Sequence, residues 1–158
     1  LQELFLRMPE YINTNCTDEI ELSRVEGHLI LIKCSPMKSR INRGCRELEV
    51  IIDEASFEIV EAFRFYHSKD QEYDNVRSGA ISDADAIRIA KSKVDGVIEY
   101  SKNFTIRVEE ITDQRIRVIF PYNMWDQKKK FFMPGGDYAA EVLLDAESGN
   151  ILRVWVGS

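Results

Sequence analysis

The side chains in this chain that are best suited to acid–base chemistry are two pairs of carboxylates in the same local pattern. Glu49 and Asp53 form the first pair, and Glu141 and Asp145 form the second. If each pair lies along a strand, its members project from one face about 13 Å apart, which exceeds the spacing that glycosidases use. Both aspartates also precede turns, where an aspartate accepts backbone N–H bonds. We therefore expect structural roles for these carboxylates.

The remaining reactive side chains form no known catalytic motif. His28 and His67 have no Cys, Ser or carboxylate neighbour at a spacing that supports catalysis. The chain lacks the G-x-S-x-G, P-loop, H-E-x-x-H and dinucleotide-binding patterns. Gly135 and Gly136 are not followed by a helix start that would bind phosphate. We predict a protein that is not an enzyme and that holds no cofactor and no metal.

The cysteines indicate no zinc site and no complete disulfide framework. Cys16, Cys34 and Cys45 all lie in the first half of the chain, without C-x-x-C spacing. Cys34 and Cys45 flank a long loop and can pair in an oxidising compartment. The other interpretation is buried free thiols in a reducing cytoplasm, and the inward strand position expected for Cys34 favours it.

Two long loops carry the candidate partner-binding residues. Residues 35–46 include four positive charges and no acidic residue, and residues 121–134 mix lysines with aromatic residues. Exposed aromatic side chains beside positive charges suit protein recognition, and long loops on rigid scaffolds are frequent binding sites. The alternative is that Trp125, Phe131 and Phe132 pack on the sheet while the lysines stay in solvent. The candidate site residues are Lys38, Arg40, Arg43, Arg46, Trp125, Lys128, Lys129, Lys130 and Phe131.

Composition narrows the class of partner. The net charge is −6 and 44% of the residues are hydrophobic, which is typical of a globular protein with a core. Net acidity disfavours nucleic acid, because phosphate binding needs a basic face. No stretch reaches the roughly 18 consecutive apolar residues of a membrane span, and no signal-peptide pattern is present. Since the chain begins at Leu1 rather than Met, we expect upstream residues: helix residues, a processed leader or an anchor.

The elements that would position these loops occur twice in the sequence. Residues 49–60 reappear as residues 141–152, with Glu, Val, Asp, Ser and Ile kept at equivalent places. Upstream, residues 19–25 align with 105–111, and residues 30–34 align with 116–120. Such a self-match indicates a repeated structural unit, and the alternation of apolar residues predicts strands. The second copy carries about six extra residues in its long loop, an insertion of a kind that loops tolerate.

A helix is predicted before the second set of strands. Ser82 suits the N-cap, and apolar residues at helical spacing continue to Val94, ahead of Gly96. By the repeat, the first copy should have a matching helix whose end is formed by residues 1–8 before Pro9.

The copies differ at the turn between their last two strands. Gly149 supplies a positive φ after Asp145, but the first copy has Phe57 at that place. This difference predicts either another turn type or a strained turn.

These patterns predict an α+β protein of two related α-β-β-β-β units, in which each antiparallel sheet has a helix packed on one face. The first unit would span residues 1–67, with its helix truncated at the start, and the second unit residues 81–158. Residues 68–80 are polar and are expected to form a linker.

The second copy resembles a known family. The helix motif of residues 85–90, followed by strands and the strand–Asp–Gly–strand pattern of residues 141–152, looks like the PepSY domain. The stretch from Gly135 to Gly157 is also similar to small bacterial immunity proteins described as NTF2-like. The resemblance covers residues 81–158 and extends to the first copy only through the repeat. Neither family implies a catalytic set.

Both resemblances imply a protein that binds and inhibits another protein. The similarity to immunity proteins implies neutralisation of a bacterial toxin in the cytoplasm, which is the function and location that we expect first. The PepSY similarity implies an extracytoplasmic regulator or inhibitor of a peptidase or cell-wall enzyme, anchored by a segment upstream of Leu1. The expected partner is another protein in either case, not a nucleic acid.

Overall fold

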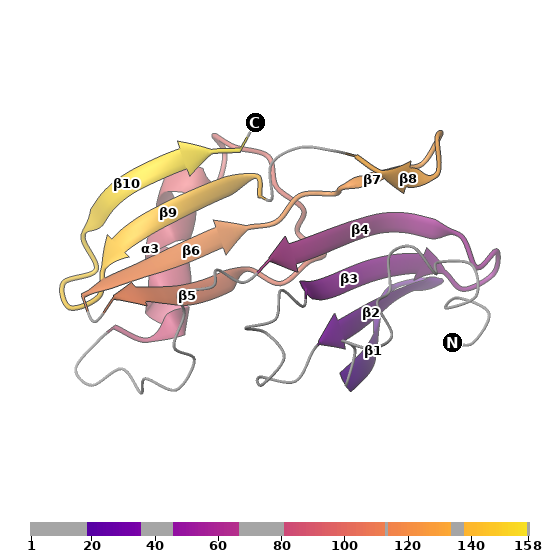
Figure 1. Ribbon diagram of the computed structural model, residues 1–158, viewed down its shortest axis with the longest axis horizontal. Coiled ribbons are helices and arrows are strands. Elements are labelled where there is room, and N and C mark those ends of the chain that lie inside the picture. Colours follow the sequence, from indigo (N-terminus) through magenta and orange to yellow (C-terminus); the bar gives the residue numbers. More distant parts are fainter. Residues whose placement is uncertain (1–18, 36–45, 67–80, 113, 134–137, 158) are drawn as a thin grey trace. The chain divides into compact units, whose positions relative to one another are not determined.

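The computed structural model describes residues 19–35, 46–66, 81–112, 114–133 and 138–157 (Figure 1). The chain divides into two compact units. Unit 1 comprises Leu1–Lys69 and Asn123–Pro134, and unit 2 comprises Asp70–Tyr122 and Gly135–Ser158. Unit 1 contains strands β1 (Glu19–Glu26), β2 (Leu29–Ser35), β3 (Arg46–Asp53), β4 (Ile59–Tyr66), β7 (Trp125–Asp126) and β8 (Phe131–Phe132). Unit 2 contains helix α3 (Asp83–Val94) and strands β5 (Arg107–Thr112), β6 (Arg115–Phe120), β9 (Ala140–Asp145) and β10 (Ile151–Val156).

The predicted α+β class is wrong. The described part of the chain is mostly strand, with two four-stranded antiparallel sheets and a single helix, rather than a helix on each unit. The prediction transferred the helix of the second copy to the first by analogy, and the residues expected to form it, 1–8, lie outside the described residues. Eight strands of six to eight residues outweigh one helix of 12 residues.

The two sheets share their strand order and register. The order is β1-β2-β3-β4 in unit 1 and β5-β6-β9-β10, read from the other edge, in unit 2. Ile32 pairs with Val50, and Val118 pairs with Val142. These are residues that align in the sequence repeat, so the matching segments of the two copies form matching strands.

The irregularities of the sheets are also repeated. The register of β1 shifts around Val25 and that of β5 around Ile111. The same holds for β4 around Val60 and for β10 around Leu152. Because a β-bulge bends its strand and increases the local twist, both copies have kept the same local distortions as well as the same pairing.

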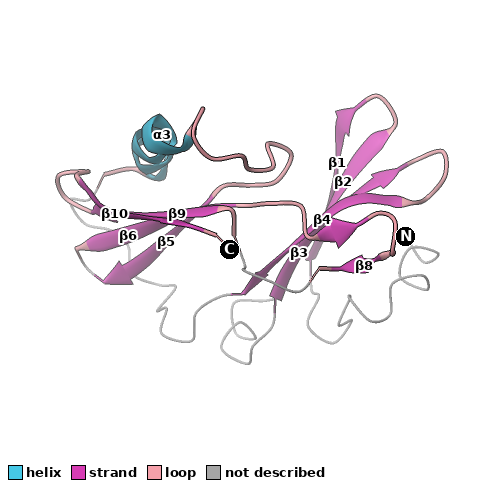
Figure 2. Ribbon diagram, turned by 90° about the horizontal axis from the view of Figure 1, so that it is seen from above, coloured by secondary structure: helices cyan, strands magenta, loops and turns pink. Residues whose placement is uncertain are grey.

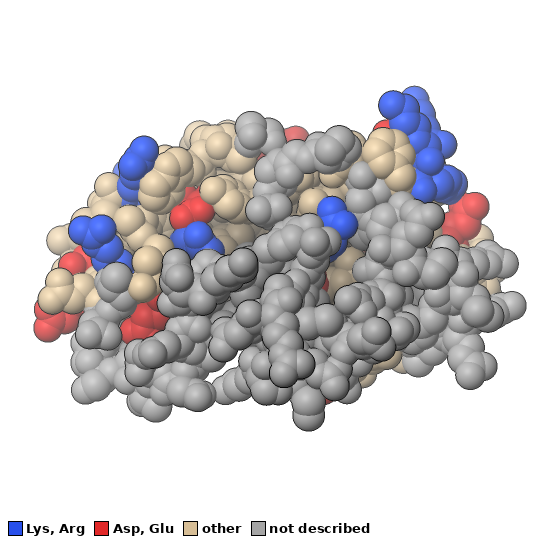
Figure 3. All heavy atoms as spheres, viewed as in Figure 1, with Lys and Arg blue, Asp and Glu red and all other residues tan. Residues whose placement is uncertain are grey.

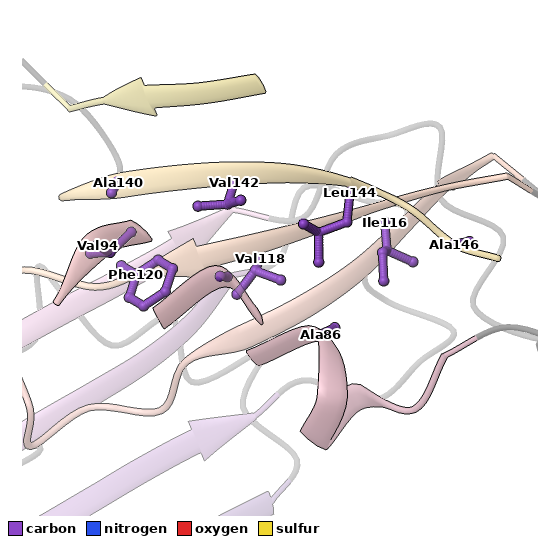
Figure 4. Close-up of a cluster of buried hydrophobic side chains, with 10 residues drawn as sticks. Ala86, Val94, Ile116, Val118, Phe120, Ala140, Val142, Leu144 and Ala146 are labelled. Carbon is purple, nitrogen blue, oxygen red and sulfur yellow. The ribbon is translucent and has the colours of Figure 1, made fainter. Parts of the chain in front are cut away.

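Helix α3 covers one face of the unit 2 sheet (Figure 2). Its N-cap is Ser82, whose side chain accepts a hydrogen bond from the backbone N–H of Asp85 at 3.1 Å. The helix ends before Gly96, which has a φ of 78°. Its buried residues share one stripe and meet the sheet core (Figure 4): Ala86, Ala90 and Val94 against Ile116, Val118, Phe120, Ala140, Val142, Leu144 and Ala146.

Strand β3 is the central buried strand of unit 1. All five residues from Leu48 to Ile52 are at most 6% exposed, including Glu49 at 0%. Because successive side chains of a strand point to opposite faces, the burial of this nearly continuous apolar run shows that β3 is covered on both faces.

Most of the long loop of the second copy, which carries the extra residues, belongs to unit 1. Residues 123–133 form the β7–β8 hairpin, whose base lies along the outer edge of β4. The sequence division into residues 1–67 and 81–158 had placed this segment with the second copy.

No described helix has the length and apolar character needed to cross a membrane.

Candidate functional site

The β7–β8 hairpin, residues 123–133, contains the candidate site residues whose placement can be described. Its base is bonded to β4 through Asn123 and Met124. The Met124 backbone N–H donates to the carbonyl of Ala62 at 2.7 Å. The Asn123 side-chain oxygen accepts from the backbone N–H groups of both Ala62 and Trp125, at 3.0 Å each. Asn123 therefore joins the strand edge to the hairpin.

Apolar burial strengthens this attachment. Met124 is 1% exposed and Trp125 is 6% exposed. The Met124 sulfur accepts a hydrogen bond from the Arg64 backbone N–H at 3.4 Å, and the Trp125 indole N–H donates to Gln127 Oε1 at 3.1 Å. An open strand edge is a site of unwanted pairing, so the hairpin base also protects β4.

The hairpin turn is organised by Asp126. One of its carboxylate oxygens accepts the backbone N–H groups of Lys128 at 2.9 Å and Lys129 at 3.0 Å. The Lys130 N–H donates to the Asp126 carbonyl at 2.8 Å, and Lys130 has a φ of 57°. The aspartate thus holds three consecutive lysines at the tip.

The same turn occurs at Asp53 and at Asp145. Each aspartate accepts backbone N–H bonds from the residues two and three positions later, and its carbonyl accepts from the residue four positions later. That last residue has a positive φ in all three turns: Phe57, Lys130 and Gly149. The sequence interpretation recognised Asp53 and Asp145 but missed Asp126. The available signal was an aspartate directly before a four-residue polar stretch and an aromatic strand.

The three lysines at the tip differ in their surroundings. Lys130 lies 3.7 Å from the Glu58 carboxylate, so part of its charge is balanced locally. The Lys129 ammonium lies 5.9 Å from the centre of the Phe131 ring. Within the described ranges no ion pair involves Lys128 or Lys129. The positive side chains at the hairpin tip stand out in Figure 3.

The other candidate residues are placed as follows. Trp125 is buried and Phe131 is half-buried, so the interpretation in which the aromatic residues pack inward holds for Trp125. Lys38, Arg40 and Arg43 lie outside the described residues. Arg46 begins β3, but its side chain, like that of Phe132, is also outside the described part.

The carboxylates considered for acid–base chemistry have structural surroundings. Glu141 is 6% exposed and lies 3.7 Å from Arg117 Nε, and Arg117 also bonds Glu109 on the neighbouring strand. Asp145 holds its turn, and hydrogen bonds from Ser148, first from its backbone, lower the pKa of this carboxyl. These contacts link adjacent strands and close a hairpin.

Cys34 is a free, buried thiol at 2% exposure, as its inward strand position indicated. Burial raises its pKa to about 11, so the thiol stays protonated at neutral pH and is a poor nucleophile. Cys16 and Cys45 lie outside the described residues. In the part of the chain that can be described, no three His, Cys, Asp or Glu side chains are grouped as metal ligands.

Comparison with known proteins adds no relative. No protein-family model matches the chain, and neither the curated proteins nor the solved structures contain a significant match. Function must therefore be inferred from the residues themselves.

Proposed function

We propose that this protein is a non-enzymatic binding protein that neutralises a partner protein, and that it serves as the immunity protein of a bacterial toxin. The observation that supports this proposal is the pair of exposed lysines, Lys128 and Lys129, at the tip of a firmly attached hairpin. In a chain with a net charge of −6, this tip is a local positive feature. It suits an acidic patch on a partner.

The attachment of the hairpin favours binding. Two lysines on a loose loop would lose conformational freedom when a partner docks, which reduces affinity. Here the Asp126 carboxylate holds the backbone of both lysines, and Asn123 and Met124 fix the base of the hairpin. Only the lysine side chains remain to be ordered on binding.

The toxin as partner follows from the resemblance of residues 135–157 to NTF2-like immunity proteins, and this function places the protein in the cytoplasm. Two steps test the proposal. The chain is used to capture partners from its native host, in parallel with the variant K128E/K129E and the control K93E/K102E. The control makes the same charge change at two exposed lysines of unit 2.

The proposal predicts that the wild-type chain and the control retain one protein that the hairpin variant loses. That protein, expressed alone, should arrest growth, and co-expression of the wild-type chain should restore it. The proposal is wrong if no protein is retained, or if the captured protein binds K128E/K129E as well as the wild-type chain. A toxin gene directly upstream in the genome would agree with it.

A second function is favoured by unit 2. Helix α3 precedes a four-stranded antiparallel sheet and packs on one of its faces, which is the order on which the PepSY resemblance rests. In that case the captured partner is an extracytoplasmic peptidase or cell-wall enzyme. Assays of the captured partner separate the two functions. If the second function is correct, the chain slows cleavage of the partner's substrate, and the partner expressed alone does not arrest growth.

A further inference from the structure

The two sheets differ at one outer edge. In unit 1 the outer edge of β4 is covered by Asn123 and Met124, which bond to both the N–H and the carbonyl of Ala62. Strand β10 is the equivalent outer strand of the unit 2 sheet (Figure 1). No described residue forms a corresponding bond to the outer edge of β10.

The backbone of Val154 faces this outer edge of β10, to which none of the described segments bonds. Val154 pairs with Val142 as Ala62 pairs with Val50, so Val154 occupies the position of Ala62 in the repeat. Gly157 donates its N–H to the Ala139 carbonyl at 2.7 Å. Since hydrogen-bonding direction alternates along an antiparallel strand, Trp155 bonds towards β9, whereas Val154 and Val156 bond outward.

The side chains of this edge are unusually apolar. Leu152 is 48% exposed, Val154 38% and Val156 66%. Edge strands that stay unpaired are normally protected by charges, prolines or very short length. Strand β1, an edge of the other sheet, has Glu19, Glu21, Arg24 and Glu26 among its residues, whereas the only charge within β10 is Arg153.

We propose that two copies of this chain associate through antiparallel pairing of their β10 strands, with Val154 of one copy opposite Val154 of the other. This arrangement is two-fold symmetric, so the same residues serve on both sides. It extends the four-stranded sheet of each unit 2 across the pair. The N–H and carbonyl of each Val154 then bond to those of its counterpart, as Ala62 bonds to the hairpin.

The sequence of β10 is complementary to itself in this register. Arg153 lies opposite Trp155 of the second copy, and Leu152 lies opposite Val156. Within one chain the Arg153 guanidinium already lies 4.4 Å over the centre of the Trp155 ring, so the two groups are suited to each other. A shift that centres the pairing on Arg153 would place two arginines opposite each other, which is destabilising.

A cysteine placed at the symmetry centre tests the register. Val154→Cys is made in a C16S/C45S background, in which Cys34 remains buried. Directly opposite residues of a hydrogen-bonded pair have Cα atoms about 5.5 Å apart, within disulfide range. The matched control is Val156→Cys, which is more exposed but would face Leu152, so that its own counterpart lies about 13 Å away along the strand.

After mild oxidation, Val154→Cys should give at least ten times more disulfide-linked dimer than Val156→Cys at equal concentration. Equal yields would indicate random collision and overturn the proposal.

Sedimentation equilibrium provides the second measurement. The wild-type chain should show a concentration-dependent dimer, and Val154→Lys should weaken the association at least tenfold, because it sets two positive charges opposite each other. A wild-type chain that remains monomeric would also overturn it. Neither experiment involves Lys128 or Lys129, so its outcome does not depend on whether the proposed partner-binding function is correct.

Discussion

Phe57 and Gly149 occupy the same position of the same turn, with φ values of 57° and 74°. Each accompanies an aspartate that accepts the same set of backbone N–H bonds. The first copy therefore has a strained version of the turn rather than a different turn. The surroundings of the two positions also differ: a Cβ at Gly149 would lie 2.8 Å from Ile89 Cδ1 of α3, so that side chain would have to shift, whereas Phe57 is 45% exposed.

Phe57→Gly should stabilise unit 1. A side chain in the left-handed region costs about 1–2 kcal/mol, and the greater freedom of glycine in the unfolded chain offsets roughly 0.4–1 kcal/mol of that gain. We expect a net increase of about 0.5–1 kcal/mol in the free energy of unfolding, measured by urea denaturation. Phe57→Ala, which removes the ring but keeps the strain, is the control. Equal stabilisation by both variants would show that ring exposure, not φ, limits stability.

Gly149→Ala should destabilise unit 2 by about 1–3 kcal/mol, because it adds backbone strain and a close contact with Ile89. Gly27→Ala is the matched control, since Gly27 has a φ of 54° but no atom within 4 Å of the added Cβ. Urea midpoints of the two variants should differ, with the larger loss at Gly149. Identical losses would mean that α3 does not restrict the turn.

Asp145 should make stability depend on pH in the acid range. Its pKa is lowered in the folded chain, chiefly by hydrogen bonds from Ser148. Its contribution is therefore fully present above its unfolded pKa of about 4 and is lost as the pH falls through the lower folded pKa. The stability difference between wild type and Asp145→Asn should shrink between pH 7 and pH 3. A difference that is constant with pH would contradict this role.

Asn123→Ala should loosen the hairpin from β4. It removes the acceptor for the N–H groups of Ala62 and Trp125, and each partner left unsatisfied costs about 1–3 kcal/mol. Hydrogen exchange at the Ala62 amide should accelerate, and Trp125 fluorescence should shift to longer wavelength. Gln127→Ala, which removes only the indole partner at 3.1 Å, should leave the Ala62 amide protected. Unchanged exchange in Asn123→Ala would show that Met124 alone holds the hairpin.

Local patterns predicted the local structure of this chain. The N-cap at Ser82, the apolar stripe of α3 and the aspartate turns involve residues a few positions apart, and each has a physical signal that a single segment contains. The alignment of the two copies also agrees with the pairing register of the strands in the two sheets. A slip of one residue would move every apolar side chain of a strand to the other face of the sheet, so the apolar pattern restricts the register.

The position of the β7–β8 hairpin was not predictable in this way. Asn123 bonds to Ala62, 61 residues earlier in the chain, and neither residue has a local feature that indicates the other. Trp125 is buried in the attached hairpin, although its neighbouring lysines favour an exposed loop in the sequence. The helix expected at residues 1–8 was inferred from the repeat, which conserves strands and turns but need not conserve the layer that covers them.

The central claim is that Lys128 and Lys129 form the partner-binding tip of the hairpin. Its most direct test is the affinity of the captured partner for the wild-type chain, K128E/K129E and K93E/K102E, measured by titration calorimetry with melting temperatures recorded in parallel. We predict that the hairpin variant weakens binding at least tenfold, about 1.4 kcal/mol, with an unchanged melting temperature, while the control binds as the wild type does. Equal affinity of all three chains, or equal losses in both variants, would contradict the claim.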